Sequence, residues 1–256
     1  MSEVVASLSG RVAFVAGGYG GIGQACAKAL VDQGATVVVA GRDAGKADAA
    51  ARALGGKIPA TSVAFDARDV PSIRAAVEAV ASAHHRIDFL VNCVGTQQIE
   101  PLVDVTEEAF DRVVEVNLKA AMFLGQAVAR VQIAARSGGR HVHLLSVRAM
   151  LGVRDRGYSS YCSSKGGLAL LVRQHAVELA RNGINVNGVA PTVVRTRMAS
   201  DWNDPETHRR LLERIPLGRI AEVGDVSGPV LFFLGPASAF VTGQILYVDG
   251  GITATQ

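Results

Sequence analysis

The chain has 256 residues, of which 49% are hydrophobic and 19% charged, and its formal net charge is +3. No Pro-, Ser- or charge-rich linker divides it, so we predict a single domain over residues 1–256. The mild charge without a basic run argues against a nucleic-acid partner. No apolar run reaches the roughly 18 residues that a membrane span needs, which argues against a membrane partner.

Short β-rich runs alternate with longer helical stretches along the chain. We predict strands near residues 11–16, 35–40, 60–65, 88–92, 139–145, 184–189 and 244–248. We predict helices near residues 22–33, 44–54, 71–84, 106–136, 158–182 and 222–234. Strands such as 36–40 are apolar on both faces, which is typical of a parallel sheet between helices. The predicted fold class is therefore α/β: a Rossmann-like, doubly wound, mostly parallel seven-stranded sheet in three α/β/α layers.

A glycine-rich turn follows the first strand and precedes helical sequence. In a strand, turn and helix of this kind, bare backbone can approach a pyrophosphate, and the helix N-terminus supplies partial positive charge. We therefore predict a dinucleotide site whose residues include Gly17, Tyr19, Gly20, Gly21, Ile22 and Gly23.

Other candidate residues stand directly after strands, where ligands of doubly wound sheets bind. They are Gly41-Arg42, Asp66-Ala67, Asn92 to Gly95, Ser146 and Pro191-Thr192. Gly and Asn are ordinary turn formers, and Asp66 could be a helix cap. Their common position at one sheet edge favours the functional interpretation.

Tyr161 and Lys165 lie four residues apart in predicted helix, so their side chains share one face about a turn apart. A nearby cation lowers the pKa of a phenol from about 10 towards the working range of an acid–base catalyst. The pair predicts a proton donor, Tyr161, whose pKa Lys165 lowers. Such pairs also occur on solvated helix faces, and Ser146 at a strand end strengthens the functional interpretation.

Together these residues resemble the short-chain dehydrogenase/reductase family, from about Leu8 to Gly251. The motifs that carry the resemblance are TGxxxGxG at Ala16 to Gly23, NNAG at Asn92 to Gly95, the mid-helix Asn117, YxxxK at Tyr161 to Lys165, the proline turn at Pro191 to Thr196 and VDGG at Val248 to Gly251. Ala16, Tyr19, Cys93 and Thr192 depart from the family's usual residues. Ser146 precedes Tyr161 by 15 residues, which implies a longer intervening loop.

The resemblance implies hydride transfer between a nicotinamide and a carbonyl or secondary alcohol, with Tyr161 as general acid or base. Lys165 would also bind the nicotinamide ribose, and Ser146 would hold the substrate oxygen. Asn117 would interrupt its helix and hold a water that connects Lys165 to solvent. The less specific interpretation of Asn117 is an exposed mid-helix residue. No metal ligands are predicted.

The end of the second strand predicts which dinucleotide is bound. Related folds that choose NAD place an acidic residue there to accept from the ribose 2′-hydroxyl. By resemblance that position is Gly41, and Arg42 follows with a guanidinium suited to a 2′-phosphate. Asp43 is better interpreted as a helix N-cap, although the glycine turn lacks a basic residue before Gly21. We favour NADP(H), with NAD(H) as the alternative.

The remaining cofactor contacts are family assignments. The resemblance implies that Asp66 accepts from the adenine amino group beside the Ala67 backbone. It implies that Asn92 and Gly95 line the ribose, and that Val194 offers its backbone to the carboxamide. The full set of these assignments adds Val94, Pro191 and Thr196.

Substrate identity is expected to reside in two segments, Val147 to Gly157 and a lid near residues 196–215. Arginines in both could favour an anionic substrate, although solvated arginines on loops are more common. Within enzymes, a 3-ketoacyl thioester reductase and a sugar or polyol dehydrogenase both stay open. An enoyl reductase is less favoured because the alcohol-forming residues are present. A catalytically silent dinucleotide-binding sensor or scaffold is the alternative of another class.

Three further expectations concern the whole protein. Cys26, Cys93 and Cys162 are odd in number and lack CxxC spacing, which indicates reduced thiols and a cytoplasmic protein. By family analogy, residues 107–136, the helix of Tyr161 and the last strand at 244–248 would make subunit contacts. We therefore expect a homotetramer acting on a small-molecule carbonyl or alcohol substrate.

Overall fold

The computed structural model describes residues 7–56, 58–154, 156–196 and 204–255. Seven parallel strands form one sheet in the order β3-β2-β1-β4-β5-β6-β7. The strands are β1 (Val12–Ala16), β2 (Thr36–Gly41), β3 (Thr61–Ala64), β4 (Phe89–Asn92), β5 (Gly139–Leu144), β6 (Ile184–Pro191) and β7 (Ile245–Val248). The predicted fold class and all seven strands are confirmed.

Eight α-helices are described, and all but one fall where the sequence predicts helix. They are α1 (Gly21–Asp32), α2 (Ala44–Leu54), α3 (Val70–His84), α4 (Glu107–Val114), α5 (Ala120–Ala135), α6 (Ser159–Leu179), α7 (Pro205–Arg214) and α8 (Val223–Leu234). The predicted single helix over 106–136 is instead α4 and α5 joined by a π-helical turn at Glu115–Lys119. Among these helices, none combines the length and the apolar character that crossing a membrane requires.

The sequence analysis predicts no helix at α7, because it assigns residues 196–215 to a lid. Local signals for it exist: Asp204 accepts a hydrogen bond from the Thr207 amide as N-cap, Pro205 occupies the first turn, and Glu206 is acidic there. Part of the predicted lid, residues 197–203, lies outside the described residues.

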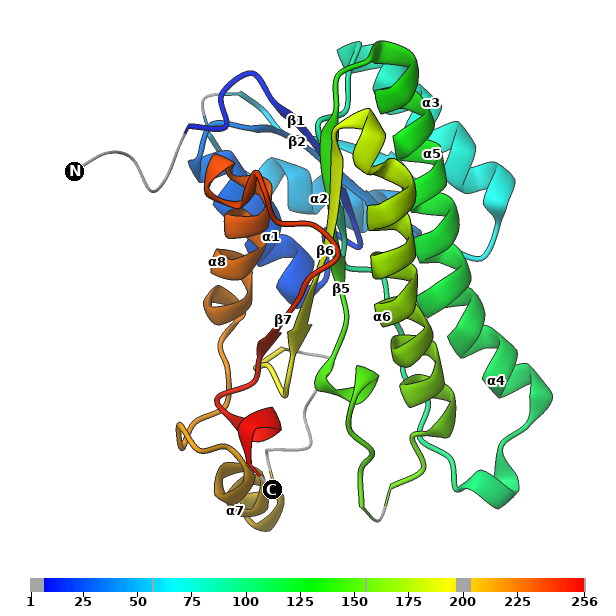
Figure 1. Cartoon of the computed structure of the whole chain (residues 1–256), viewed down its shortest axis with the longest axis vertical. Helices are drawn as coiled ribbons and strands as arrows, with labels where there is room; N and C mark the ends of the chain where they lie inside the picture. Colours follow the sequence, from blue (N-terminus) through cyan, green and yellow to red (C-terminus); the bar gives the residue numbers. More distant parts are fainter. Residues whose placement is uncertain (1–6, 57, 155, 197–203, 256) are drawn as a thin grey trace.

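Helices cover both faces of the sheet (Figure 1). Alternate residues of β1 point to opposite sides: Ala13 and Val15 join a core with α1, α2 and α8, whereas Phe14 packs with Ile73 of α3 and Leu124 of α5. A third core lies between α6 and the strands β5 and β6. Burial on both faces explains why the strands read as continuous apolar runs.

The sheet reverses its winding direction between β1 and β4. The chain passes from β1 to β2 and β3 on one side, then returns to place β4 on the other side of β1. The crossovers on the two sides diverge, which opens a crevice beyond the carboxyl ends of these two strands. The glycine turn follows β1 and the turn of residues 92–95 follows β4, so both predicted site segments meet there.

Candidate active site

The glycine turn after β1 has contacts that a larger residue could not make. Gly17 has φ +74°, and a Cβ there would lie 2.9 Å from the Cys93 carbonyl carbon. A Cβ on Gly23 would lie 2.2 Å from the Gly17 carbonyl oxygen. Helix α1 begins with Gly20 as N-cap, with no side-chain cap and no acidic residue in its first turn. Its first N–H groups are thus open to an anion, which fits the pyrophosphate of a dinucleotide.

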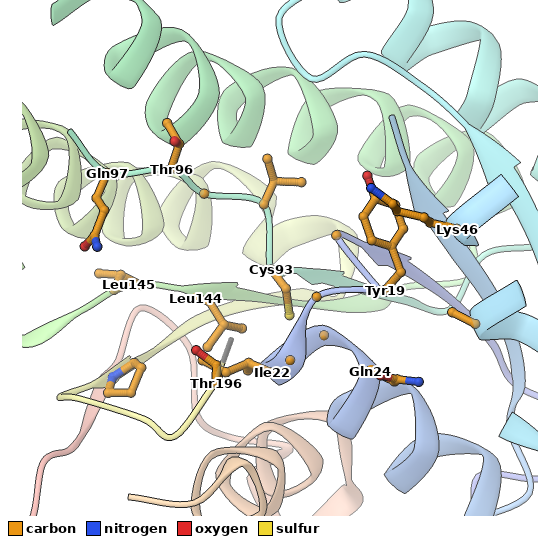
Figure 2. A pocket seen from close by; sticks show the side chains of 18 of the residues that line it. Tyr19, Ile22, Gln24, Lys46, Cys93, Thr96, Gln97, Leu144, Leu145 and Thr196 are labelled. Carbon is orange, nitrogen blue, oxygen red and sulfur yellow. The ribbon is translucent and has the colours of Figure 1, made fainter. Parts of the chain in front are cut away.

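A cavity of about 650 Å³ lies over this turn. Twelve predicted cofactor residues line it: Gly17, Tyr19, Gly20, Gly21, Ile22, Gly23, Val94, Gly95, Tyr161, Lys165, Pro191 and Thr196. Figure 2 shows Tyr19 and Lys46 at one end of the cavity and Gln97 and Leu145 at the other. The elongated cavity therefore connects the end of β2 with the predicted reacting centre.

Several lining residues were not predicted. Lys46 lies on α2, Thr96 and Gln97 extend the turn after β4, and Leu144 and Leu145 come from the end of β5. Thr96 and Gln97 continue the turn that follows β4, so their position after a strand end is a signal in the sequence for a site at these residues. Lys46 carries no such signal, because only the packing of α2 beside α1 brings it to the cavity.

Five predicted cofactor residues do not line this cavity: Arg42, Asp66, Ala67, Asn92 and Val194. The Asn92 side chain is buried, accepts from the Val94 amide at 3.1 Å and meets His143 Nδ1 at 3.2 Å. Its side chain therefore shapes the turn from beneath, and the expected position of Asn92 beside the ribose stays a prediction. Val194 is buried beside Ala221 and lines a second cavity instead.

Asp66 and Ala67 follow β3, which is an edge strand of the sheet. Asp66 is half-buried and accepts from the Arg68 amide at 2.9 Å. Its possible role as a helix cap belongs instead to Asp69, which accepts from the Ser72 amide.

The end of β2 lacks an acidic side chain and is covered by an aromatic ring. A Cβ on Gly41 would lie 2.3 Å from the Tyr19 ring. Tyr19, which departs from the family's usual residue, therefore packs directly on this glycine. The Asp43 amide donates to the Tyr19 hydroxyl at 3.3 Å. The Asp43 carboxylate caps α2 through the Lys46 amide at 3.0 Å, as predicted. Arg42 is exposed beside them.

Tyr161 and Lys165 lie on α6 and line the cavity together. The Lys165 Nζ is buried, donates to the Leu144 carbonyl at 2.8 Å and lies 5.8 Å from the centre of the Tyr161 ring. Ser146 follows β5, and its hydroxyl interacts with the phenol despite the longer loop between them. The fold therefore brings the predicted Ser, Tyr and Lys to one place.

Burial dominates the electrostatics of this group. It raises the pKa of Tyr161 to about 12, while the Ser146 hydroxyl and the Arg148 charge lower that pKa by less. Burial also lowers the pKa of Lys165 to about 8. The expectation that Lys165 keeps the tyrosine pKa low is wrong for this structure. Burial destabilises the phenolate by more free energy than the neighbouring groups contribute to stabilising it. Tyr161 is thus a protonated donor at neutral pH.

Asn117 lies in the π-helical turn between α4 and α5, so its predicted interruption of the helix is confirmed. Its side-chain oxygen accepts from the Thr96 amide at 2.8 Å, and its nitrogen donates to the Thr96 carbonyl and the Ser164 hydroxyl, both at 2.9 Å. It is buried rather than exposed. A Cβ on Gly95 would lie 3.6 Å from both Asn117 Oδ1 and Lys165 Nζ, so these groups surround one glycine.

A second cavity, of about 940 Å³, adjoins the first and shares Tyr161 with it. Ser146, residues 147, 148, 152–154 and 156 of the following loop, and α7 line its walls. The described part of the predicted lid is therefore a helix that borders this cavity. Tyr161 faces both a space lined by the glycine turn and a space suited to a small molecule.

Three histidines that line neither cavity are buried. His141 and His143 are on β5, and His175 is on α6. Burial lowers the pKa of His141 to about 3 and lowers those of His143 and His175 as well. One ring nitrogen of each finds no hydrogen-bond partner in the described part of the chain. In the same ranges, no group of three or more His, Cys, Asp or Glu side chains is placed to hold a metal ion.

These lowered pKa values predict acid sensitivity. Above pH about 6.5 the three histidines are neutral in the folded and in the unfolded state. Below that pH the unfolded chain binds protons at these histidines that the folded protein does not bind. The free energy of unfolding should then fall by up to about 1.4 kcal/mol per pH unit for each imidazole. Urea unfolding between pH 7.5 and 5 measures this slope. His175→Leu should reduce the slope, and a slope equal to that of the unaltered protein would contradict the prediction.

Comparison with known proteins agrees with the geometry. A family model described as "Enoyl-(Acyl carrier protein) reductase" matches residues 17–253. L-xylulose reductase of Bos taurus is 39% identical over 97% of this chain and 98% of its own. The chain belongs to the short-chain dehydrogenase/reductase family. It is thereby assigned to the oxidoreductases that act on alcohols and carbonyl compounds.

Solved structures of the family superpose closely. A putative short-chain alcohol dehydrogenase from Sinorhizobium meliloti has a TM-score of 0.93 and 36% identity, covering 98% of this chain and 99% of that one. A gluconate 5-dehydrogenase from Burkholderia cenocepacia, solved with NADP and tartrate, has a TM-score of 0.92 and 32% identity, covering 97% of each chain.

Proposed function

We propose that this short-chain dehydrogenase/reductase interconverts a carbonyl and a secondary alcohol by hydride transfer with NADP(H). The observation that carries the proposal is that Tyr161 lines both cavities, one bordered by the glycine turn and one bordered by Ser146 and α7. A proton donor at that junction can meet a substrate carbonyl beside a bound nicotinamide.

The residues divide the work of reduction. The bound nicotinamide supplies the hydride that adds to the carbonyl carbon. The Ser146 hydroxyl holds the carbonyl oxygen, and Tyr161 gives its phenolic proton to that oxygen as negative charge develops. Lys165 binds the ribose hydroxyls, and Asn117 holds a water that connects Lys165 to solvent. In oxidation the same groups act in reverse, and Tyr161 takes the proton.

The preference for NADP(H) is supported by the end of β2. Gly41 offers no carboxylate to repel a phosphate, Arg42 is exposed beside it, and Lys46 of α2 lines the cavity. The Burkholderia relative was solved with NADP. In the proposed complex Asp66, Ala67 and the turn after β4 surround the adenosine, and Val194 with Thr196 lies near the carboxamide.

Replacing Arg42 with Ala should weaken NADPH binding by at least about tenfold and leave NADH binding almost unchanged, because a guanidinium–phosphate pair is a charge-assisted contact. Fluorescence titration with both cofactors measures the two dissociation constants. Arg52→Ala, at the far end of α2, is the control and should change neither. Equal losses for both cofactors in the Arg42 variant would contradict the phosphate assignment.

A sugar or polyol substrate is favoured over an acyl thioester. Proteins similar to this chain include L-xylulose reductase and gluconate 5-dehydrogenase. The matching family model is described by an enoyl reductase, but this chain has Ser146, Tyr161 and Lys165 at one place, which suits carbonyl chemistry. Oxidation of NADPH should be followed with ketoses, keto-sugar acids, a 3-ketoacyl thioester and an enoyl thioester. Faster turnover of either thioester would reject the sugar assignment.

A silent dinucleotide-binding sensor is the competing function. It predicts tight cofactor binding without turnover of any carbonyl or alcohol class. The presence of all four residues Asn117, Ser146, Tyr161 and Lys165 favours the enzyme, because a sensor has no use for a buried proton donor beside a substrate-sized cavity.

A homotetramer in the cytoplasm completes the proposal. Large apolar side chains are exposed where subunit contacts were predicted: Phe110 on α4, Leu170 and Val177 on α6, and Leu246 on β7. Apolar surface of this kind commonly marks an interface. The three cysteines are free thiols, which suits a reducing compartment. Sedimentation analysis would test the tetramer.

A further inference from the structure

The second cavity carries an excess of positive charge. Among the described residues, five arginines and one glutamate line it: Arg148, Arg154, Arg156, Arg210, Arg214 and Glu213. Arg210 already pairs with Glu206, and Glu213 already pairs with Arg209 on the same helix. The lining glutamate is thus engaged outside the cavity, and Arg148 and Arg214 remain without a carboxylate in the described part of the chain.

Arg148 differs from an ordinary surface arginine. It is half-buried two residues after Ser146, and its Nη1 donates to the Gly152 carbonyl at 2.7 Å and the Leu151 carbonyl at 3.4 Å. These bonds orient the guanidinium but do not neutralise its charge. Within the described ranges, no hydrogen-bond acceptor is recorded for the Nε and Nη2 groups. Burial lowers the pKa of Arg148, and the Arg214 charge lowers it further. Arg148 and Arg214 both line the second cavity, so two like charges border the same space.

We propose that Arg148 and Arg214 bind an acidic group, a carboxylate or a phosphate, of the substrate whose carbonyl meets Tyr161. The inference rests on the proposed function and names its substrate class: a small anionic keto-sugar or the corresponding hydroxy compound. Arg148 comes from the loop after Ser146 and Arg214 from the last turn of α7, so the two enter the cavity from different segments.

Partly burying an unpaired guanidinium is unfavourable, and bringing a second one near adds repulsion. An oxyanion between them relieves both costs and can accept two parallel hydrogen bonds from the Arg148 fork. A neutral polyol offers hydroxyls to the same donors but no charge. The site should therefore discriminate by charge.

The test compares three substrates and a ligand that cannot react. NADPH-dependent reduction of 5-ketogluconate, fructose 6-phosphate and fructose gives kcat/KM for a carboxylate, a phosphate and a neutral compound. Calorimetry of tartrate binding to the protein with NADP⁺ measures anion binding without turnover. We expect at least one acidic substrate to exceed fructose by at least about tenfold, and tartrate binding to weaken with added salt. Which acidic substrate is preferred distinguishes carboxylate from phosphate.

Variants separate anion binding from a structural role of Arg148. Arg148→Gln and Arg214→Gln should each lower kcat/KM for the acidic substrate by about tenfold or more, mainly through KM, with little change for fructose. Arg148→Lys should recover part of the loss. Arg181→Gln, before β6 at the opposite edge of the sheet, is the matched control and should behave as the unaltered protein. Arg214→Gln keeps the test valid if loss of the Gly152 contact disorders the Arg148 variant.

Two outcomes would overturn the inference. Equal losses for acidic and neutral substrates in both variants would assign the arginines a structural role. Efficient reduction of fructose without tartrate binding would show an enzyme whose cavity ignores charge. Tartrate binding that needs Arg148 and Arg214, but with no turnover of any substrate, would keep the anion site and reject the proposed function, so the two failures can be told apart.

Discussion

Tyr161→Phe should lower kcat for carbonyl reduction by at least about a hundredfold, which is the smaller end of what a general acid contributes. The phenylalanine ring can fill the same buried space between Ser146 and Lys165, so only the hydroxyl is lost. The structure makes the role of that hydroxyl specific: with its pKa raised to about 12, Tyr161 holds its proton until charge develops on the substrate oxygen.

The measurement is single-turnover oxidation of NADPH, which separates chemistry from cofactor release. Cofactor affinity should stay within about threefold of the original, since the glycine turn and Lys165 are untouched. Tyr247→Phe on β7 removes a phenolic hydroxyl outside both cavities and is the matched control. Turnover of the Tyr161 variant near that of the control would reject the acid–base role.

Gly23→Ala should have the second large effect. The new Cβ would lie 2.2 Å from the Gly17 carbonyl oxygen and 3.0 Å from Gly18 Cα, both backbone atoms that no rotamer change can move. The turn must open, so the N–H groups that approach the pyrophosphate shift. We expect NADPH affinity to fall by at least about a hundredfold and the free energy of unfolding to fall by about 1–3 kcal/mol, the usual cost of overpacking.

Cofactor titration and thermal unfolding check the two parts of this prediction separately. Gly224→Ala on α8 makes the same chemical change where, apart from its chain neighbours and the backbone of its own helix, no atom lies within 4 Å of the new Cβ, so neither quantity should decrease. If the Gly23 variant binds NADPH as well as the Gly224 variant does, the turn is not the place where backbone approaches the cofactor.

The sheet and its helices were predictable because their signals are local. The runs of β1 and β2 are apolar on both faces, and Asp43 stands where a cap of α2 is needed. Such patterns can be recognised without knowing the fold, because they depend only on the burial and the backbone hydrogen bonding of the segment itself. Helix α7 had the same kind of signal in Asp204 and Pro205 and was missed only because the segment was interpreted as a lid.

What the sequence by itself determined was the parallel α/β fold, the glycine turn, Ser146 at a strand end, and Tyr161 and Lys165 one helical turn apart, because spacing and strand-end position encode these. Asn117 was added to them only by the family resemblance. Only the tertiary structure decided that burial raises the Tyr161 pKa, that Asn92 supports its turn from below, and that Lys46 and Arg214 reach the cavities. Desolvation and contacts between distant segments depend on how helices pack on the sheet, and no local pattern of residues records that packing.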